Sequence, residues 1–339
     1  MRPEDGTPWQ RAGGTHEPEE PAEPREFPLI RRIEGALGGE HGPEVLVSIG
    51  DDCAVIDPAQ LRPGERLVWT IDAQVDGVHF RPELLSWEDV GYRATVAAAS
   101  DLLAMGARPI AALVAWTIPS AFEGDVAEAI ARGQRRAGDA LGLSVIGGNI
   151  ANAEALSLTT TALGGVTKPI TRRGARPGDR VVAIGAFGEA ALGFNWLSRG
   201  RSPDEAPRLV DAWRRPRILA AQARALGAVA TAMIDVSDGL AQDCGHLARA
   251  SGVRVRLELE KIAARRSEEA IEIARLVRAP LEHLELSGGE DYALVATVPA
   301  DAPLPDEAFP IGVVEEGSGV HVVGRDGRPY APPPGWSHG

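Results

Sequence analysis

The stretch Ser48-Ile49-Gly50-Asp51-Asp52-Cys53-Ala54-Val55-Ile56 places two adjacent carboxylates behind a glycine and between two apolar runs. An ionised carboxylate in an apolar setting costs free energy unless it is paired or bound to a metal. Similar interruptions recur at Thr70-Ile71-Asp72, Ser100-Asp101, Ile234-Asp235-Val236-Ser237-Asp238-Gly239 and Ser287-Gly288-Gly289-Glu290-Asp291. Carboxylates gathered from several segments are how proteins hold Mg²⁺ against nucleotide phosphates. The pattern predicts a Mg²⁺-dependent enzyme that handles phosphate groups, with Asp52, Asp101 and Asp235 sharing one pocket.

The composition narrows the classes of protein that this chain can belong to. With 339 residues, 44% of them apolar and 24% charged, the chain is long enough for two globular domains, each with its own core. Its net charge of −13 argues against a nucleic-acid or anionic-membrane surface, because both need clustered positive charge. Only two lysines occur, Lys168 and Lys261, so phosphate contacts must come from arginines, backbone N–H groups and metal.

The sequence shows no sign of a membrane or secreted protein. The first residues contain no apolar signal region. The most apolar stretch, 94–118, is interrupted by charged residues, a glycine and a proline, so it is no membrane span. Cys53 and Cys244 form no CxxC spacing, which is typical of reduced thiols in a cytosolic protein. We therefore expect a cytoplasmic protein with no nucleic-acid and no membrane partner.

The apolar periodicity predicts two α/β (α+β) domains after a disordered segment. Residues 1–26 are rich in Pro, Glu, Gly and Arg and are expected to be disordered. The boundary between the domains is expected near Thr167-Lys168-Pro169, giving domains 27–167 and 168–339. In the first domain we expect helices at 27–37, 87–105 (with Ser86 as N-cap) and 125–141, and strands at 44–49, 66–72, 143–146 and 156–166. In the second we expect strands at 180–184, 228–234, 253–259, 292–298 and 309–314, and helices at 189–197, from 208, 240–250 and 267–277.

Each acidic segment has a structural interpretation beside the functional one. Asp51, Asp52 and Asp72 are placed at strand ends, where acidic turn residues are common. Asp101 is harder to explain by folding alone, because aspartate is a poor helix former and its helix is rich in alanine.

The turn 235–239 and the glycine-rich segment 287–290 are open to two interpretations. Ser237 or Asp238 could be an N-cap, or Asp235 and Asp238 could bind metal while N–H groups at the helix start bind a phosphate oxygen. The segment 287–290 is either a flexible turn or a close approach to a ligand. His79 is either a hydrogen-bonded loop residue or a catalytic base. Neither a GxxxxGK[ST] loop nor the protein-kinase motifs occur. Phosphate transfer by this chain would therefore rely on metal ions and positioning.

Ordered motifs from Phe27 to Trp336 resemble the thiamine-monophosphate kinase family, whose superfamily includes aminoimidazole ribonucleotide synthetase and selenophosphate synthetase. They are Gly50-Asp51-Asp52-Cys53-Ala54-Val55, Asp72 with Gly77-Val78-His79-Phe80, Ser100-Asp101-Leu102-Leu103-Ala104-Met105-Gly106-Ala107, Gly147-Gly148-Asn149, Thr171-Arg172-Arg173-Gly174-Ala175, Ile234-Asp235-Val236-Ser237-Asp238-Gly239-Leu240 and Leu286-Ser287-Gly288-Gly289-Glu290-Asp291-Tyr292. The resemblance implies the two-domain architecture of aminoimidazole ribonucleotide synthetase, a homodimer paired through the N-terminal domains, and ATP between the domains. It implies transfer of the γ-phosphoryl group of ATP to thiamine monophosphate, giving thiamine diphosphate, with several Mg²⁺ ions.

The resemblance also implies roles for individual residues. Asp101, Asp235 and Asp238 would be catalytic. The metal ligands would be Asp52, Thr70, Asp72, Asp101, Asp235 and Asp238. ATP phosphates would contact Gly148, Asn149, Arg172 and Ser237. Thiamine monophosphate would contact His79, Glu290 and Trp336, with Glu290 facing its cationic part and Trp336 stacking on a ring.

Two positions depart from the family pattern and leave other hypotheses open. Asn149 stands where the family usually has aspartate, and Ile71 stands where a small hydroxyl residue is usual. The first hypothesis is direct phosphoryl transfer, in which Mg²⁺ offsets the repulsion between two phosphate groups. The second is an ATP-dependent synthetase or cyclo-ligase of the same superfamily. The third, motivated by Asn149 and Ile71, is a non-catalytic protein that binds nucleotide or thiamine phosphate.

Overall fold

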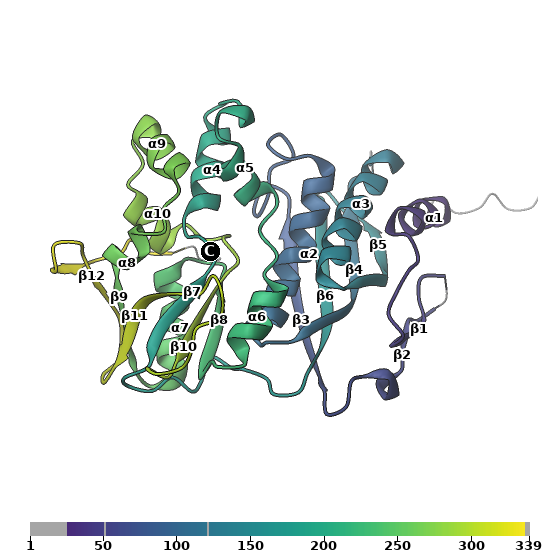
Figure 1. Ribbon diagram of the computed structural model, residues 1–339. Helices are drawn as coiled ribbons and strands as arrows, with labels where there is room; N and C mark the ends of the chain where they lie inside the picture. The colour runs from purple at the N-terminus through teal and green to yellow at the C-terminus, as the bar shows by residue number, and fades with distance from the viewer. Residues whose placement is uncertain (1–25, 51, 121, 336–339) are drawn as a thin grey trace, which may run out of the picture.

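The computed structural model describes residues 26–50, 52–120 and 122–335, which form two α/β domains side by side (Figure 1). The segment expected to be disordered therefore lies outside the described residues, apart from Glu26, which opens the first helix. Asp51 and Trp336 also lie outside them.

The N-terminal domain is a four-stranded sheet with helices on one face. The strand order is β3-β6-β4-β5, in which only β4 and β5 run parallel. A separate two-stranded hairpin, β1–β2, packs beside it. The elements are α1 (Glu26–Leu37), β1 (Val45–Val47), β2 (Val55–Ile56), β3 (Arg66–Val75), α2 (Trp87–Ala104), β4 (Arg108–Ile118), α3 (Gly124–Leu141), β5 (Ser144–Asn152) and β6 (Ser157–Val166).

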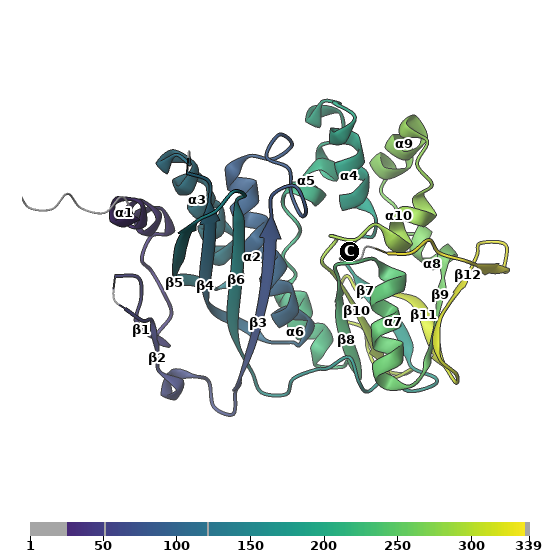
Figure 2. The ribbon, with the colours of Figure 1, turned by 180° about the vertical axis from the view of Figure 1, so that it is seen from behind.

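The helix α2 begins at a capping box and packs closely on α3. Ser86 accepts a hydrogen bond from the backbone N–H of Asp89, whose carboxylate accepts one from the N–H of Ser86, as the sequence predicted for the start of this helix. A Cβ atom on Gly91 would lie 1.9 Å from the carbonyl oxygen of Ile130, so only glycine fits this crossing. In Figure 2 the sheet lies in front of α2 and α3, and its outer face carries no helix.

The C-terminal domain contains a seven-stranded sheet in the order β13-β12-β9-β11-β7-β10-β8. Its elements are β7 (Arg180–Ile184), α4 (Glu189–Ser198), α5 (Pro207–Arg214), α6 (Ala220–Gly227), β8 (Ala232–Val236), α7 (Leu240–Ser251), β9 (Arg254–Glu258), α8 (Leu259–Ala263), α9 (Glu268–Val277), α10 (Leu281–Ser287), β10 (Ala293–Val298), β11 (Phe309–Glu315), β12 (Gly319–Val323) and β13 (Pro329–Tyr330).

One hydrophobic core runs from the N-terminal domain into the C-terminal domain. Along β7, Val181 packs on the α7 side of the sheet, whereas Val182 packs on the side of α6. This second side also contacts Ala98 and Leu102 of α2. The helix α2 is therefore buried between the two sheets, and it fixes the position of one domain against the other.

Several local expectations differ from the structure. Asp235, expected in the turn after its strand, lies inside β8 (Ala232–Val236). Residues 108–118 form the strand β4, which was not predicted, because a continuous apolar run does not distinguish a buried strand from a helix. The strand β5 continues through Gly147-Gly148-Asn149 instead of ending there. Asp72 lies inside β3 and not at its end. Within the described parts of the chain, no helix has the length and apolar character needed to cross a lipid bilayer.

Candidate active site

Two aspartates from different domains meet where α2 passes between β3 and β8. Thr70 of β3 donates a hydrogen bond from Oγ1 to Oδ2 of Asp101, at 2.5 Å. The neighbouring Ser100 donates from Oγ to Oδ2 of Asp235 on β8, at 2.6 Å. Figure 2 shows that β3 and β8, the edge strands of their sheets, are the strands of the two domains that lie nearest each other. The helix therefore presents consecutive residues to both domains, with carboxylates on each side.

The charge of Asp235 is poorly compensated. Its side chain is buried, and this burial, followed by the nearby charge of Asp101, raises the pKa of Asp235 to about 6. The hydrogen bond from Ser100 and the charge of Arg172 act in the opposite direction but are smaller. Two carboxylates held this close, with oxygen donors around them, favour the binding of a cation.

The turn 237–239 is held by an acidic residue that the sequence analysis missed. Asp243 of α7 accepts hydrogen bonds on Oδ2 from the backbone N–H groups of 237, 238 and 239, at 3.1, 3.1 and 3.2 Å. These three N–H groups are therefore already paired, whereas α7 itself begins one residue later, at Leu240. The N-cap of α7 is Gly239, and neither Ser237 nor Asp238 caps the helix. Burial, and then the charge of Asp235, raise the pKa of Asp243 to about 7.

The segment 287–292 packs against this turn and places Glu290. The backbone N–H of Glu290 donates to the carbonyl oxygen of Ser237 at 2.7 Å. The carboxylate of Glu290 pairs with Nη2 of Arg93 at 2.5 Å and accepts a hydrogen bond from Nε1 of Trp213 at 3.1 Å. Glu290 is therefore bound to residues of both domains, because Arg93 lies on α2 and Trp213 on α5.

Asp72 and Arg172 lie around the same two aspartates, and His79 follows on the loop after β3. The charges of Asp72 and Asp235 both act on Tyr292, whose pKa burial raises well above its ordinary value, so both lie near this ring. The charge of Arg172 lowers the pKa of Asp235, so Arg172 also lies nearby. The Nδ1 atom of His79 accepts a hydrogen bond from the backbone N–H of Val75 at 3.2 Å.

Asp52, Gly148 and Asn149 are not brought to this cluster. Asp52 lies in the exposed loop of the β1–β2 hairpin, which packs on β4 and β5. Asn149 lies on the edge strand β5, where it is paired with Ala115 of β4. In the sheet, β5 is three strands away from β3. Since Val114 and Trp116 point into the core under the helices, Ala115 and Asn149 point to the outer face. The expectation that Asp52, Asp101 and Asp235 share one pocket therefore holds within this chain for the last two only.

Three residues that hold the site were not singled out from the sequence. Ser100 is adjacent to Asp101 and belongs to the same motif. Asp243 has a local signal, because an acid in the first turn of a helix binds free N–H groups. Arg93 has the signal that identified Asp101, a charge inside a helix of small residues, and its side chain is only 1% exposed.

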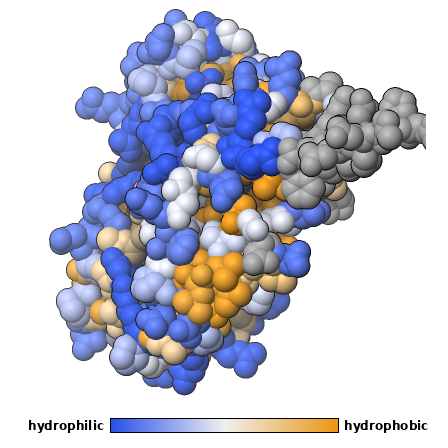
Figure 3. Space-filling model, turned by 90° about the vertical axis from the view of Figure 1, so that its right-hand side faces the viewer, coloured by the Kyte–Doolittle hydropathy of each residue, from blue (hydrophilic) through white to orange (hydrophobic). Residues whose placement is uncertain are grey.

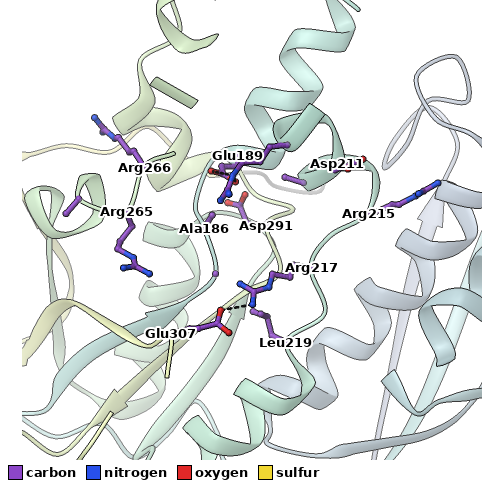
Figure 4. Close-up of a pocket in the computed structure, with 14 residues that line it drawn as sticks. Ala186, Glu189, Asp211, Arg215, Arg217, Leu219, Arg265, Arg266, Asp291 and Glu307 are labelled. Carbon is purple, nitrogen blue, oxygen red and sulfur yellow. Dashed lines mark hydrogen bonds and ion pairs between the residues drawn. The ribbon is translucent and has the colours of Figure 1, made fainter. Parts of the chain in front are cut away.

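A cavity of about 590 Å³ lies on the C-terminal domain between α4, α5 and α8 (Figure 4). Its lining includes Asp291 but none of the residues expected to bind metal, ATP or substrate. Four of its five arginines have acidic partners: Arg208 pairs with Glu189, Arg217 with Glu307, Arg215 with Asp89, and Arg266 with Glu282 and Glu285. The fifth, Arg265, lies over the ring of Phe309, 4.7 Å from its centroid.

The residues around Asp101 and Asp235 fit Mg²⁺ in their chemistry. Thr70, Asp101 and Asp235 offer oxygen donors only, which Mg²⁺ prefers. Among the residues that the structure describes, no group of three acids, histidines or cysteines is close enough to form a ready-made metal site. This is compatible with Mg²⁺, which is usually held by one or two carboxylates together with substrate phosphates and water.

The two domains, with Asp101 and Asp235 meeting where they adjoin, define a protein of the AIR synthase related class. The family model of the N-terminal domain of AIR synthase related proteins matches residues 50–166, and that of the C-terminal domain matches residues 176–325. A thiamine-monophosphate kinase of Corynebacterium glutamicum is 36% identical over 288 residues, which cover 82% of this chain and 83% of that protein.

Solved structures agree with this assignment. A thiamine-monophosphate kinase from Stenotrophomonas maltophilia, 32% identical, superimposes with a TM-score of 0.77 over 90% of this chain and 97% of the other. AaThiL complexed with AMPPCP and TMP, 31% identical, gives a TM-score of 0.76 over 92% and 96%. The chain belongs to the thiamine-monophosphate kinase family.

Proposed function

We propose that this chain transfers the γ-phosphoryl group of ATP to thiamine monophosphate by direct in-line displacement. The observation that carries the proposal is the meeting of Asp101 and Asp235 from opposite sides of the domain boundary, in a member of this family. The relative complexed with AMPPCP and TMP supports the two ligands. The acceptor phosphate is already an anion, so the reaction needs charge compensation more than a general base.

Mg²⁺ would be held by Asp101 and Asp235, with Thr70, Asp72 and Asp238 beside them. When bound, the ion would neutralise charge on the phosphate oxygens. The protein's own contribution is to fix the two aspartates from α2 and β8 in one place. Arg172 lies within electrostatic reach of Asp235 and would contact an ATP phosphate, and Ser237 would contact another. His79 and Glu290 would contact the acceptor.

The chain is proposed to act as a homodimer that pairs through the outer face of the N-terminal sheet. On β3 of this face Leu67, Trp69 and Ile71 are 46%, 72% and 67% exposed. Leu46 and Val55 of the hairpin are also exposed, and Figure 3 shows apolar surface on the side of the molecule where the hairpin lies. An apolar area of this kind is typical of a protein interface. Asp52, Gly148 and Asn149, which lie away from Asp101 and Asp235 of their own chain, would then be placed beside the partner.

The cytoplasm is the proposed location. Cys53 is exposed and Cys244 is buried, and both are free thiols, which suits a reducing compartment.

The experiment that tests the function follows thiamine diphosphate formation from thiamine monophosphate and ATP, with and without Mg²⁺. Product that depends on Mg²⁺ and contains the transferred phosphate supports the kinase. ATP hydrolysis without phosphate in the product would favour a synthetase or cyclo-ligase. Stabilisation by the ligands without turnover would favour the non-catalytic binding protein.

A further inference from the structure

We propose that Arg93 is a positioning residue for the acceptor, which it holds through Glu290. The inference rests on the proposed contact between Glu290 and thiamine monophosphate. It adds a residue from the other domain that fixes where this carboxylate lies. Arg93 itself is not accessible to the acceptor, because its side chain is 1% exposed, whereas that of Glu290 is 35% exposed.

The first argument is the geometry of the three side chains, Arg93, Trp213 and Glu290. Each oxygen of Glu290 has one donor: Nη2 of Arg93 at 2.5 Å, and Nε1 of Trp213 at 3.1 Å. Arg93 in turn donates from Nη1 to the carbonyl oxygen of Trp213, and its guanidinium lies over the indole ring, 5.1 Å from the centroid. A carboxylate has about four lone-pair sites. Two therefore remain for a donor on the acceptor, with the carboxylate held in one orientation.

The second argument is that a gain in folding stability does not explain why Arg93 is buried beside Glu290. A buried ion pair is often no more stabilising than apolar residues of the same volume. In addition, Nε of Arg93 is buried without a hydrogen-bond acceptor among the described residues, which costs further free energy. Glu290 itself has a positive φ of +58°, a strained conformation for a residue other than glycine. Strain and an unsatisfied donor at one contact are typical of a functional site.

The third argument is the position of Arg93 on α2. The same helix carries Ser100 and Asp101, which contact β8 and β3. Eight residues separate Arg93 from Asp101, or about 12 Å along the helix axis. The helix α2 therefore fixes the positions of two groups. One is Asp101, proposed to face the transferred phosphate, and the other is the carboxylate of Glu290, proposed to face the rest of the acceptor.

Kinetics of four variants test the proposal: Glu290→Gln, Arg93→Met, their combination, and Trp213→Phe. If Arg93 acts through Glu290, each single substitution of these two raises KM for thiamine monophosphate about tenfold or more, with KM for ATP changed by less than about twofold. The double variant should then be no worse than the poorer single variant, because both remove one interaction. Trp213→Phe keeps the ring and removes only the N–H donor, so a smaller rise of about threefold is expected.

Arg108→Met is the matched control. Arg108, at the start of β4, is also mostly buried and pairs with Glu44 and Glu65, which directly precede β1 and β3. This variant should unfold more easily and leave KM for thiamine monophosphate unchanged.

The outcomes separate this inference from the proposed function. If the rises in KM for thiamine monophosphate caused by Arg93→Met and Glu290→Gln add up in the double variant, the positioning role is overturned. Equal rises in KM for thiamine monophosphate and KM for ATP would overturn it too. If Arg93→Met does not fold, the cycle of Arg93→Lys with Glu290→Gln decides in the same way, because lysine keeps the charge but loses the planar guanidinium that joins Glu290 to Trp213. An unchanged KM in Glu290→Gln would overturn the acceptor contact and this inference with it, while catalysis by Asp101 and Asp235 is tested separately.

Discussion

Asp101 and Asp235 are the two side chains on which the proposed chemistry depends. Because the two negative charges repel each other, ionising both carboxylates destabilises the folded protein when no cation is bound. Such a pair is stabilising only when a cation and phosphates lie between its members.

We expect Asp101→Asn and Asp235→Asn each to lower kcat by about 100-fold or more, because charge compensation at the transferred phosphate is lost. Without Mg²⁺, Asp235→Asn should be at least as stable as the wild type, since a repulsion is removed. Turnover assays and denaturant unfolding measure the two effects. Asp139→Asn, on the exposed face of α3, is the control that should change neither. Turnover close to wild type in both variants would contradict metal-held catalysis.

Asp291 predicts a pH dependence of stability that is separate from catalysis. Its carboxylate accepts hydrogen bonds from the N–H groups of Gly188 and Ala190, but burial outweighs them and raises its pKa from 3.8 to about 8. The folded protein keeps this proton up to about pH 8, whereas the unfolded chain releases it near pH 4. The free energy of unfolding should therefore fall as the pH rises between these values, by at most about 1.4 kcal/mol per pH unit from this group.

The variant Asp291→Asn carries no titrating group at this position. Urea unfolding at pH 5, 6.5 and 8 should accordingly give a flatter pH profile for the variant than for the wild type. Parallel profiles would show that Asp291 is ionised in the folded protein.

At the scale of elements, the contact between α2 and α3 determines whether the site residues are presented correctly. A Cβ on Gly91 would collide with Ile130, and one on Gly133 would lie 1.9 Å from the carbonyl oxygen of Glu88. Gly91→Ala should push the helices apart and lower the free energy of unfolding by about 2 kcal/mol. Gly35→Ala in α1, where nothing lies within 4 Å, should instead raise it by up to about 1 kcal/mol. Unfolding curves of the two variants that shift in the same direction would contradict this packing argument.

Elements with a local signal could be predicted from the sequence, and those that depend on distant contacts could not. The start of α2 was predictable because Ser86 and Asp89 form a capping box within one turn. The strand β4 was not, because it is buried between β6 and β5 and shows no alternation. Gly148 suggested the end of a strand, yet a Cβ there would lie 1.9 Å from the carbonyl oxygen of Val114, so the glycine lets β5 continue beside β4.

The same distinction applies to the site. The aspartates could be chosen from the sequence because a charge in an apolar or small-residue setting is conspicuous. Their partners could not, since the hydrogen bonds from Ser100 to Asp235 and from Trp213 to Glu290 join residues 135 and 77 positions apart. The separation of Asp52 from Asp101 was equally hidden, because the face of the sheet on which a loop packs is set by tertiary contacts.

At the scale of the whole molecule, the exposed outer face of the N-terminal sheet predicts association. Sedimentation velocity should give the mass of a dimer for the wild type and of a monomer for Trp69→Lys, because a charge would then lie within the proposed interface. Leu276→Lys is the control, since Leu276 is 63% exposed on α9, far along the chain from this face. A wild-type monomer at micromolar concentration would contradict the homodimer.

The burial of α2 between two sheets has one more consequence. A helix packed on every side can neither stretch nor tilt, so Arg93 and Asp101 stay at a fixed separation. If one end of the acceptor is held through Glu290 and the other lies at Asp101 and Asp235, this fixed separation selects acceptors of one length. A molecule of another length could bind at Glu290, but its phosphate would not be aligned at the aspartates. Such a molecule would be rejected without any side chain that blocks its binding.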